Sequence, residues 1–294
     1  MHESHDITIV VSNYNASDII GEALQSIIDT AGDVRFDVLV IDDASTDGGF
    51  GAVRTRFEKD ERFSFVENKK NVGVSTLNIV LERTEARYVM TLDTDARLHP
   101  GSLQAMISFM DKTPGAGAAT AKLLNRDGSV QNYYRRLMTP VYCFFTTPIG
   151  RVFDKYVFRL HYFNRYHYSD LDVTRVFEIE QPPVACLIMR RSALGEYIMS
   201  PAYHLYFIDV DFCRRMYARG YKIFLVPDAP VTHLKSAAAS KRPSAWTRRQ
   251  YYSSLLTYFK RNYTLWYPLI WIIVLLDRVT RALMFSVVGR EPVR

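Results

Sequence analysis

The sequence lacks the motifs of several common protein classes. It contains no GxGxxG after its first strand-like segment and no GxxxxGK[ST], which argues against a dinucleotide-binding site and a P-loop. Its three cysteines, Cys143, Cys186 and Cys213, show no CxxC spacing, which argues against a disulfide framework or zinc ribbon and favours a reducing compartment. The polar residues 2–6 predict no signal peptide. No apolar run reaches the roughly 20 residues that a membrane-spanning helix needs.

What the sequence does contain is typical of a globular protein. The chain has 294 residues, of which 48% are hydrophobic and 23% charged, enough for one large domain or two small ones. The net charge of +6 is uneven, because residues 233–294 carry eleven Lys or Arg and only two acids. A nearly neutral body with a basic, aromatic tail predicts an anionic membrane surface as partner, and no nucleic acid is expected.

The first 125 residues alternate between strand-like and helix-like patterns. Apolar runs predict strands at 7–11, 36–41, 63–66 and 88–92, and helices are predicted at 20–31, with Ser17 as N-cap, and at 51–57, 74–83 and 101–110. Repeated βα units predict the α/β class, with a Rossmann-like, mostly parallel sheet flanked by helices. Residues 132–178 are expected to form loops and short helices, followed by a strand (183–190), a helix (209–219) and a strand (221–226).

Polar side chains follow each of the four strands. The ends of these strands carry Asn13 and Asn15, then Asp42 and Asp43, then Asn71 and Gly73, then Asp93, Thr94 and Asp95. Open α/β sheets bind ligands at this edge, although such residues are also common in turns and helix caps. Asp93 and Asp95 alternate in extended backbone, so they point the same way and can share one Mg²⁺ or Mn²⁺ ion. Without a basic phosphate cradle, this pair indicates a metal-bridged nucleotide diphosphate.

As an ordered set, these segments resemble a known family. VSNYNASDIIGEALQSI, VLVIDDASTDGG, NKKNVGVSTLN and YVMTLDTDARLHP are similar to the nucleotide-site blocks of family-2 glycosyltransferases, which have the GT-A fold. DGSVQNYYRR, PPVACLIMRRSAL, LYFIDVDFCRRMYARGYKIFLVPDAPVTH and YYSSLLTYFKRNY resemble later blocks of the bacterial rhamnosyltransferase branch. The resemblance spans about residues 6–263. It implies a catalytic domain (1–234), with a nucleotide-sugar half (1–125) and an acceptor half (126–234), followed by a mobile loop and basic, aromatic helices (235–294).

The resemblance also implies roles for residues of the donor half. Asn13, Tyr14 and Asn15 would line the nucleoside pocket, and Asp43, together with Asp42, would hydrogen-bond the pyrimidine ring. Asn71, Gly73 and Thr94 belong to the same donor site. Asp93 and Asp95 correspond to the DxD motif, and His233 matches a histidine that completes the metal site in some relatives. The alternative for His233 is a strand-end histidine in a polar shell.

In the acceptor half, Asp209 matches the catalytic base of the family. Ile208 stands where the family usually has Glu, and Asp211 is a second candidate base. The alternative is that Asp209 only caps its helix. Arg135 and Arg136 could bind phosphate, or they could simply lie on a solvated loop. Tyr133, Tyr134 and Gln181 could contact a sugar, or they could only pack in the fold. A loop that covers the diphosphate is predicted to carry Trp246, Arg248 and Arg249.

Taken together, the resemblance implies an inverting, metal-dependent transferase that moves L-rhamnose from dTDP-rhamnose onto a polyprenyl-diphosphate-linked glycan. A hexosyltransferase using a UDP-sugar is an alternative. A catalytically silent nucleotide-sugar-binding subunit is another, because Ile208 departs from the pattern.

The tail predicts attachment to a membrane surface. Residues 265–276 and 282–288 are two apolar pieces, each too short to span a bilayer. Trp266, Tyr267 and Trp271 suit a membrane interface, and the tail basic residues Lys260, Arg261, Arg278 and Arg281 suit anionic headgroups. A peripheral or monotopic position on the cytoplasmic face of the bacterial inner membrane is expected. The alternative is packing of the tail on the body or on a second subunit of a homodimer.

Overall fold

The computed structural model describes residues 5–169, 171–234 and 244–288. The segment 235–243, expected to be a mobile loop, lies outside the described residues. The first half follows the predicted βα order. Its elements are β1 (Ile7–Asn13), α1 (Ile20–Thr30), β2 (Phe36–Asp42), α2 (Phe50–Phe57), β3 (Phe63–Glu67), the 3₁₀ helix η1 (Gly73–Glu82) and β4 (Tyr88–Leu92). Strands β3, β2, β1 and β4 are neighbours and pair in parallel, which confirms the prediction for this half.

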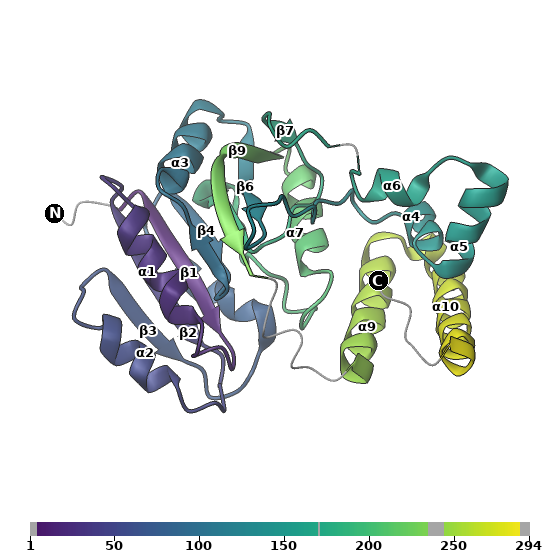
Figure 1. Ribbon diagram of the computed structural model, residues 1–294, viewed down its shortest axis with the longest axis horizontal. Helices are drawn as coiled ribbons and strands as arrows, with labels where there is room; N and C mark the ends of the chain where they lie inside the picture. The colour runs from purple at the N-terminus through teal and green to yellow at the C-terminus, as the bar shows by residue number, and fades with distance from the viewer. Residues whose placement is uncertain (1–4, 170, 235–243, 289–294) are drawn as a thin grey trace.

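Strand β1 is buried on both faces of the sheet. Successive strand residues point to opposite faces. Ile7 and Ile9 therefore join a core cluster with α1, whereas Val10 joins a second cluster with residues of η1 and α7 (Ile208–Ala218). This two-sided burial explains why β1 reads as a continuous apolar run rather than an alternating one. Figure 1 shows α1 lying across this part of the sheet.

The second half of the sheet is mixed. It contains β5 (Ala96–Leu98), β6 (Ala116–Leu124), β7 (Phe177–Glu178), β8 (Cys186–Arg190) and β9 (Lys222–His233), with α3 (Ser102–Lys112) and the 3₁₀ turn η3 (Arg191–Ala193) between them. Strand β8 inserts antiparallel between β4 and β6, whereas β6 and β9 pair in parallel. Strand β9 runs to His233, beyond the predicted end at residue 226, and β5 pairs antiparallel with its last residues.

Residues 132–178 contain short helices, as predicted. They are α4 (Pro140–Phe145), α5 (Pro148–Phe153), the π-helical turn η2 (Asp154–Phe158) and α6 (Tyr162–Tyr166). Thr139 and Thr147 cap α4 and α5, each directly before a proline in the first turn, where a missing N–H costs little. These helices lie beside α9 (Ser244–Asn262) and α10 (Tyr267–Val288), at the end of the molecule away from β3 (Figure 1).

The tail packs on the body with one face. After α9 and the turn η4 (Thr264–Trp266), the two predicted apolar pieces form one helix, α10, in which Pro268 lies in the first turn. Ile270, Ile273 and Val274 are buried at helical spacing in the core cluster that also contains α7. Among the helices of the described residues, none is both long and apolar enough to cross a bilayer.

Two local predictions were wrong. Ser17 does not cap α1, whose N-cap is Ile19. The Ser17 hydroxyl instead donates to Asp47 Oδ1 at 3.1 Å. Residues 74–83 are not an α-helix but the greater part of the 3₁₀ helix η1, which begins one residue earlier at Gly73. Gly73 has a φ of +70°, and a Cβ at this position would collide with the carbonyl oxygen of His204.

This geometry predicts that Gly73→Ala destabilises the protein more than a matched glycine change. Gly101→Ala is the control, because its φ of +80° imposes the same left-handed strain while a Cβ there meets nothing within 4 Å. The strain alone costs roughly 1–2 kcal/mol. Urea unfolding should show a clearly larger loss of unfolding free energy for Gly73→Ala, and equal losses would contradict the close contact with His204.

Candidate active site

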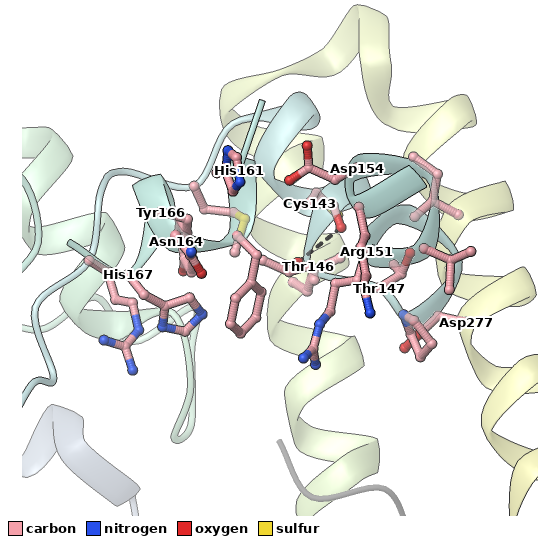
Figure 2. Close-up of a pocket in the computed structure, with 18 of the residues that line it drawn as sticks. Cys143, Thr146, Thr147, Arg151, Asp154, His161, Asn164, Tyr166, His167 and Asp277 are labelled. Atoms are coloured by element: carbon pink, nitrogen blue, oxygen red, sulfur yellow. Dashed lines mark hydrogen bonds between the residues drawn. The ribbon is translucent and has the colours of Figure 1, made fainter. Parts of the chain in front are cut away.

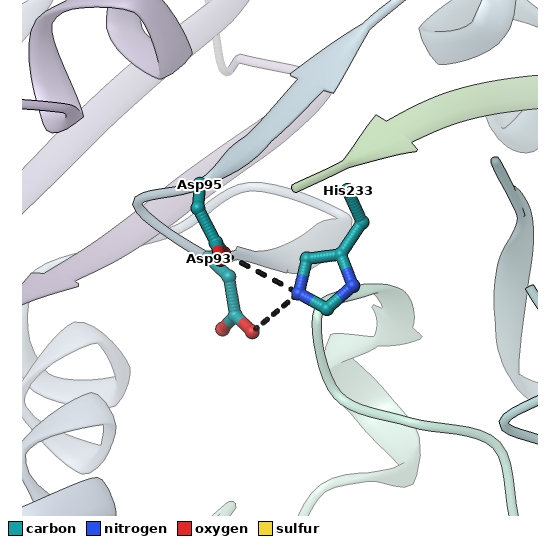
Figure 3. Close-up of side chains that lie close together, drawn as sticks. All are labelled: Asp93, Asp95 and His233. Atoms are coloured by element: carbon teal, nitrogen blue, oxygen red, sulfur yellow. Dashed lines mark ion pairs between the residues drawn. The ribbon is translucent and has the colours of Figure 1, made fainter. Parts of the chain in front are cut away.

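Asp93, Asp95 and His233 come together although 138 residues separate the second from the third. Asp93 and Asp95 follow the end of β4, and the β5–β9 pairing sets Ala96 opposite His233. His233 Nε2 lies 3.3 Å from Asp95 Oδ1 and 3.8 Å from Asp93 Oδ2, with the side chains directed toward one another (Figure 3). One ligand atom from each residue lies within 4.8 Å of the others, so the group can hold a metal ion.

The hydrogen bonds of His233 favour its use as a ligand. Gln131 donates through Nε2 to the carbonyl oxygens of Leu124 and His233, so its Oε1 is the acceptor in the 3.0 Å contact with His233 Nδ1. The imidazole therefore carries its proton on Nδ1 and directs the lone pair of Nε2 toward the two carboxylates. Sequence reasoning missed Gln131, which lies in the irregular stretch and contacts His233 only in the folded chain.

The two aspartates of this group have different surroundings. Asp95 is only 5% exposed, whereas 49% of the Asp93 side chain is exposed. Desolvation by the surrounding protein raises the pKa of Asp93 to about 6; a protonated His233 would oppose this rise, and the negative charge of Asp95 adds to it. A cation placed between them would offset this like-charge repulsion, so the donor set fits Mg²⁺ or Mn²⁺.

Asp42 and Asp43, at the end of β2, accept hydrogen bonds from residues of the neighbouring loops. Asn13 Nδ2 and Ser45 Oγ donate to Asp42 Oδ1 at 2.7 and 2.6 Å. Asp43 accepts bonds from the backbone N–H of Val72 and of Gly73 and from Asn68 Nδ2. Both aspartates are buried and bonded to neighbouring residues, and the contact of their carboxylates with a pyrimidine ring stays a prediction. They hold the loops that shape the edge.

The other donor-half candidates lie along the same edge. Asn13 is fully buried, and its Nδ2 donates to Asp42 Oδ1 at 2.7 Å. Tyr14 and Asn15 are partly exposed, and Asn15 Oδ1 accepts from Thr46 N at 2.7 Å. Asn71 Nδ2 donates to the carbonyl oxygen of Asp43 at 3.1 Å. Thr94, which lies between Asp93 and Asp95 in the sequence, is buried. The fold thus collects all of these residues, and it leaves Tyr14 and Asn15 accessible.

Asp209 lies in the first turn of α7. The helix begins at Ile208 and its N-cap is Phe207, in a left-handed conformation, so the alternative that Asp209 is the cap is wrong. Gln181 Nε2 donates to Asp209 Oδ2 at 2.7 Å. Burial raises the pKa of Asp209 above its ordinary value, while the bond from Gln181, bonds to backbone N–H groups and the positive charge of Arg135 oppose that rise. A carboxylate with a raised pKa is better suited to accept a proton.

Gln181 and Arg135 position this carboxylate. Their backbones form two hydrogen bonds, of 2.9 and 3.0 Å, which join the loop before β8 to the start of the irregular region. Gln181 Oε1 is buried and, within the described chain, has no hydrogen-bond partner. Because Asp93 N also donates to the carbonyl oxygen of Ala185 at 2.8 Å, the loop that carries Gln181 connects the acid group at β4 with Asp209.

Several acceptor-half candidates have partners within the fold. Arg136 pairs with Glu180 at 2.8 Å, and Asp211 pairs with Arg215 at 2.9 Å. Tyr134 is fully buried, so its alternative of packing is correct. Tyr133 lies edge-on to His233, with ring centroids 6.1 Å apart.

The predicted loop over the diphosphate is also corrected. Trp246, Arg248 and Arg249 belong to α9, which begins at Ser244, and not to a loop. Trp246 packs edge-on against His204, with ring centroids 6.1 Å apart. Helical backbone held by such packing does not offer the freedom that a closing loop needs.

Comparison with known proteins places these features in a family. Residues 8–198 match the model of "Glycosyl transferase family 2". The chain is 30% identical over 125 residues to a putative teichuronic acid biosynthesis glycosyltransferase, TuaG, of Bacillus subtilis, a match that covers 42% of this chain and 49% of that protein. It is 25% identical over 256 residues to an N-acetylglucosaminyl-diphospho-decaprenol L-rhamnosyltransferase of Mycobacterium tuberculosis, covering 80% of this chain and 78% of that one. The chain thus spans about half of the first relative and most of the second.

Solved structures show the same GT-A fold. GalNAc-T7, crystallised with UDP, GalNAc and Mn²⁺, superposes with a TM-score of 0.61 at 13% identity, over 82% of this chain and 45% of that one. Residues 1–349 of Staphylococcus aureus TarS superpose with a TM-score of 0.54 at 17% identity, over 92% of this chain and 79% of that one. At these identities the likeness establishes the fold alone.

The geometry predicts that Asp95→Asn weakens binding of Mn²⁺ at least tenfold. The change keeps the size of a buried side chain but removes the charge that a hard cation prefers. Electron paramagnetic resonance of free Mn²⁺ during titration measures the affinity. Asp60→Asn, on an exposed turn where Asp60 pairs with Arg62, is the control. Equal affinities of the wild type and Asp95→Asn would contradict the assignment of these three residues as ligands.

Proposed function

The chain belongs to glycosyl transferase family 2, and we propose that it transfers a sugar from a nucleotide-sugar donor to a glycan acceptor with inversion at the anomeric carbon. The observation that carries the proposal is the pair of sites at one sheet edge. Asp93, Asp95 and His233 form a group that could hold a cation. Asp209 has a raised pKa and is joined to this edge through the loop that carries Gln181.

On the donor side, Asp93, Asp95 and the Nε2 atom of His233 would hold Mg²⁺ or Mn²⁺. The bound ion supplies positive charge that stabilises a leaving nucleoside diphosphate. GalNAc-T7, which shares the fold, was crystallised with UDP and Mn²⁺, which supports a metal-dependent nucleotide site here. Tyr14 and Asn15, the accessible residues of the same edge, are proposed to line the nucleoside pocket.

On the acceptor side, Asp209 acts as the general base. It takes the proton of an acceptor hydroxyl while that oxygen bonds to the anomeric carbon. The bond from this carbon to the donor phosphate oxygen breaks, and its electron pair leaves with the nucleoside diphosphate. Gln181 orients Asp209 through Nε2, and its unpartnered Oε1 can accept a hydrogen bond from the acceptor sugar. Ile208 is buried and packs in the core, so its replacement of Glu leaves Asp209 in place.

The mycobacterial relative supports a finer proposal for the substrates. Its name describes an L-rhamnosyltransferase acting on a diphospho-decaprenol-linked sugar, and it aligns with 80% of this chain. We therefore propose L-rhamnose from dTDP-rhamnose as donor and a polyprenyl-diphosphate-linked glycan as acceptor, with a UDP-hexose as the alternative donor. Retention of Asp93, Asp95 and Asp209 together argues against a catalytically silent subunit.

Exposed apolar side chains support a position on a membrane surface. On α10 and the preceding turn η4, Leu265 is 95% exposed, and Trp266, Trp271, Ile272 and Leu276 are each about half exposed. A second set lies on α5 and η2, which pack near α10: Val152, Phe153, Tyr156, Val157 and Phe158. Exposed aromatic and aliphatic groups of this kind insert at the headgroup level of a bilayer. We propose the cytoplasmic face of the bacterial inner membrane, where a lipid-linked acceptor would be present.

Asp209→Asn is expected to lower kcat by about 10²–10⁴-fold, because an amide cannot accept the proton. Its donor affinity should stay nearly unchanged, since the donor contacts lie at the other end of the site. The wild-type rate should fall as the pH decreases through the raised pKa of Asp209, where the base becomes protonated. The variant should lose this dependence. Nucleoside diphosphate release, measured against pH with a competent acceptor, reports both effects.

Asp211→Asn is the matched control on the same helix, because Asp211 is paired with Arg215. It should lower the melting temperature while the residual kcat of the folded enzyme stays near that of the wild type. A crippled Asp211→Asn enzyme beside an active Asp209→Asn enzyme would move the role of base to Asp211.

The double change Trp266→Ser and Trp271→Ser is expected to release the protein from anionic vesicles. Both rings are 51% exposed, so the fold loses little while the apolar contact with lipid is lost. Sedimentation with phosphatidylglycerol vesicles measures the bound fraction, which should also decrease with salt. Val130→Ser, at an exposed apolar residue outside the helical end of the molecule, is the control. Unchanged sedimentation of the double variant would exclude this face as the membrane contact.

A further inference from the structure

A cavity of about 1130 Å³ lies between the short helices of residues 140–167 and the tail helices α9 and α10 (Figure 2). One part of its wall is apolar, with Met138, Leu255, Ile273 and Val274. The other part is polar and carries five Lys or Arg, two His and two Asp. The cavity is thus amphipathic and has an excess of positive charge.

Two of the arginines have no carboxylate partner. Within the described chain, no carboxylate oxygen lies within 4 Å of the guanidinium nitrogens of Arg135 or Arg151. Arg135 donates to the backbone carbonyls of Asn132 and Tyr134, and Arg151 stacks on Phe163 at 4.3 Å. Arg135, Arg151 and His167 all line the cavity, and burial together with the positive charges of the two arginines lowers the pKa of His167 to about 4.

The two aspartates in the wall offset only part of the positive charge of its five Lys or Arg. Asp277 pairs with Arg281 at 3.0 Å and accepts the hydroxyl of Tyr252 at 2.5 Å. Asp154 is buried and accepts the backbone N–H of Leu160 at 3.0 Å. An excess of positive charge, in planar groups that can form two parallel bonds, favours an anion such as a phosphate ester.

The cavity also extends between the surroundings of Asp209 and the exposed apolar side chains of α5 and η2, which are the two regions that the proposed reaction uses. At one end, Arg135 interacts electrostatically with Asp209 and shares backbone bonds with Gln181. At the other end, Val152 and Tyr156 line the cavity and are 56% and 63% exposed, within the apolar set on α5 and η2. An amphipathic ligand could therefore place its polar end near the base and its apolar end toward the membrane-facing surface.

We propose that this cavity binds the diphosphate of a polyprenyl-diphosphate-linked acceptor, with Arg135 and Arg151 on the phosphate oxygens and the first isoprene units against Leu255, Ile273 and Val274. The inference rests on the proposed function and assigns the acceptor class to a specific part of the molecule. The sugar attached to the diphosphate would then extend past Arg135 toward Asp209.

Binding of farnesyl diphosphate to the full chain tests the assignment. Isothermal titration calorimetry should show tighter binding of farnesyl diphosphate than of inorganic diphosphate or farnesol, because only the first carries both the charge and the isoprene units. Arg151→Gln should weaken this binding at least tenfold, and Arg151→Lys should weaken it less. Arg278→Gln removes an exposed charge from α10 outside the cavity, so it should bind as the wild type does. Equal binding by wild type and a folded Arg151→Gln variant would overturn the proposal.

A second arm distinguishes the source of the phosphate. Short-chain phosphatidylglycerol should compete poorly with farnesyl diphosphate, and equal competition would overturn the assignment in favour of a general anionic-lipid site. None of these titrations involves a nucleotide sugar. A transferase that binds farnesyl diphosphate independently of Arg151 would refute this inference alone. A protein that binds it through Arg151 but turns over no nucleotide sugar would refute the proposed function alone.

Discussion

The antiparallel insertion of β8 into the sheet is the constraint on which the site depends. In a purely parallel sheet, the loops at the carboxyl edge would all follow strands. Because β8 runs the other way beside β4, with Leu92 opposite Cys186, the loop that precedes β8 arrives at the edge where Asp93 and Asp95 follow β4. That loop carries Gln181, which contacts Asp209 on α7. One reversed strand thus joins the metal-binding half to the half that holds the base.

The acidic residues at this edge of the sheet have two different kinds of surroundings, and their expected roles differ accordingly. Asp43 accepts bonds from Asn68, Val72 and Gly73, so its carboxylate holds a loop in place. Asp93 and Asp95, by contrast, face His233, and repulsion between the two carboxylates contributes to the raised pKa of Asp93. The same residue type therefore holds a loop at one place on this edge and, at another, lies beside a like charge and a histidine, where a cation can bind.

The parts of this molecule that were predictable from sequence are those with a strong local signal. Strands β1, β2 and β4 are apolar runs buried on both faces, and the DxD residues follow directly from them. Strand β6 was missed because its alanine-rich sequence, AGAATAKLL, has weak strand preference and is held by its neighbours β8 and β9. The three-residue β5, which sets Ala96 opposite His233 and so brings His233 beside Asp95, is too short to give a pattern.

Most of the other features that the sequence did not predict depend on contacts between residues far apart in the chain. Gln131 contacts His233, 102 residues away in the sequence, and Gln181 donates to Asp209, 28 residues away. The local sequence around the two glutamines does not indicate these partners. The burial of Asp42 and Asp43 likewise depends on loops that close over them. The exposed apolar set on α5 and η2 could not be anticipated, because the sequence there shows no single helical period and the π-helical turn shifts which side chains face outward.

The central claim is that this sheet edge binds a nucleotide sugar through a divalent cation. Calorimetric titration of the full chain with a panel of dTDP- and UDP-sugars, in Mn²⁺ and again in excess EDTA, tests it most directly. The account predicts that at least one donor, dTDP-rhamnose foremost, binds in Mn²⁺ and that its affinity is lost in EDTA. Binding of the same donor with equal affinity in EDTA, or of no member of the panel in either condition, would contradict it.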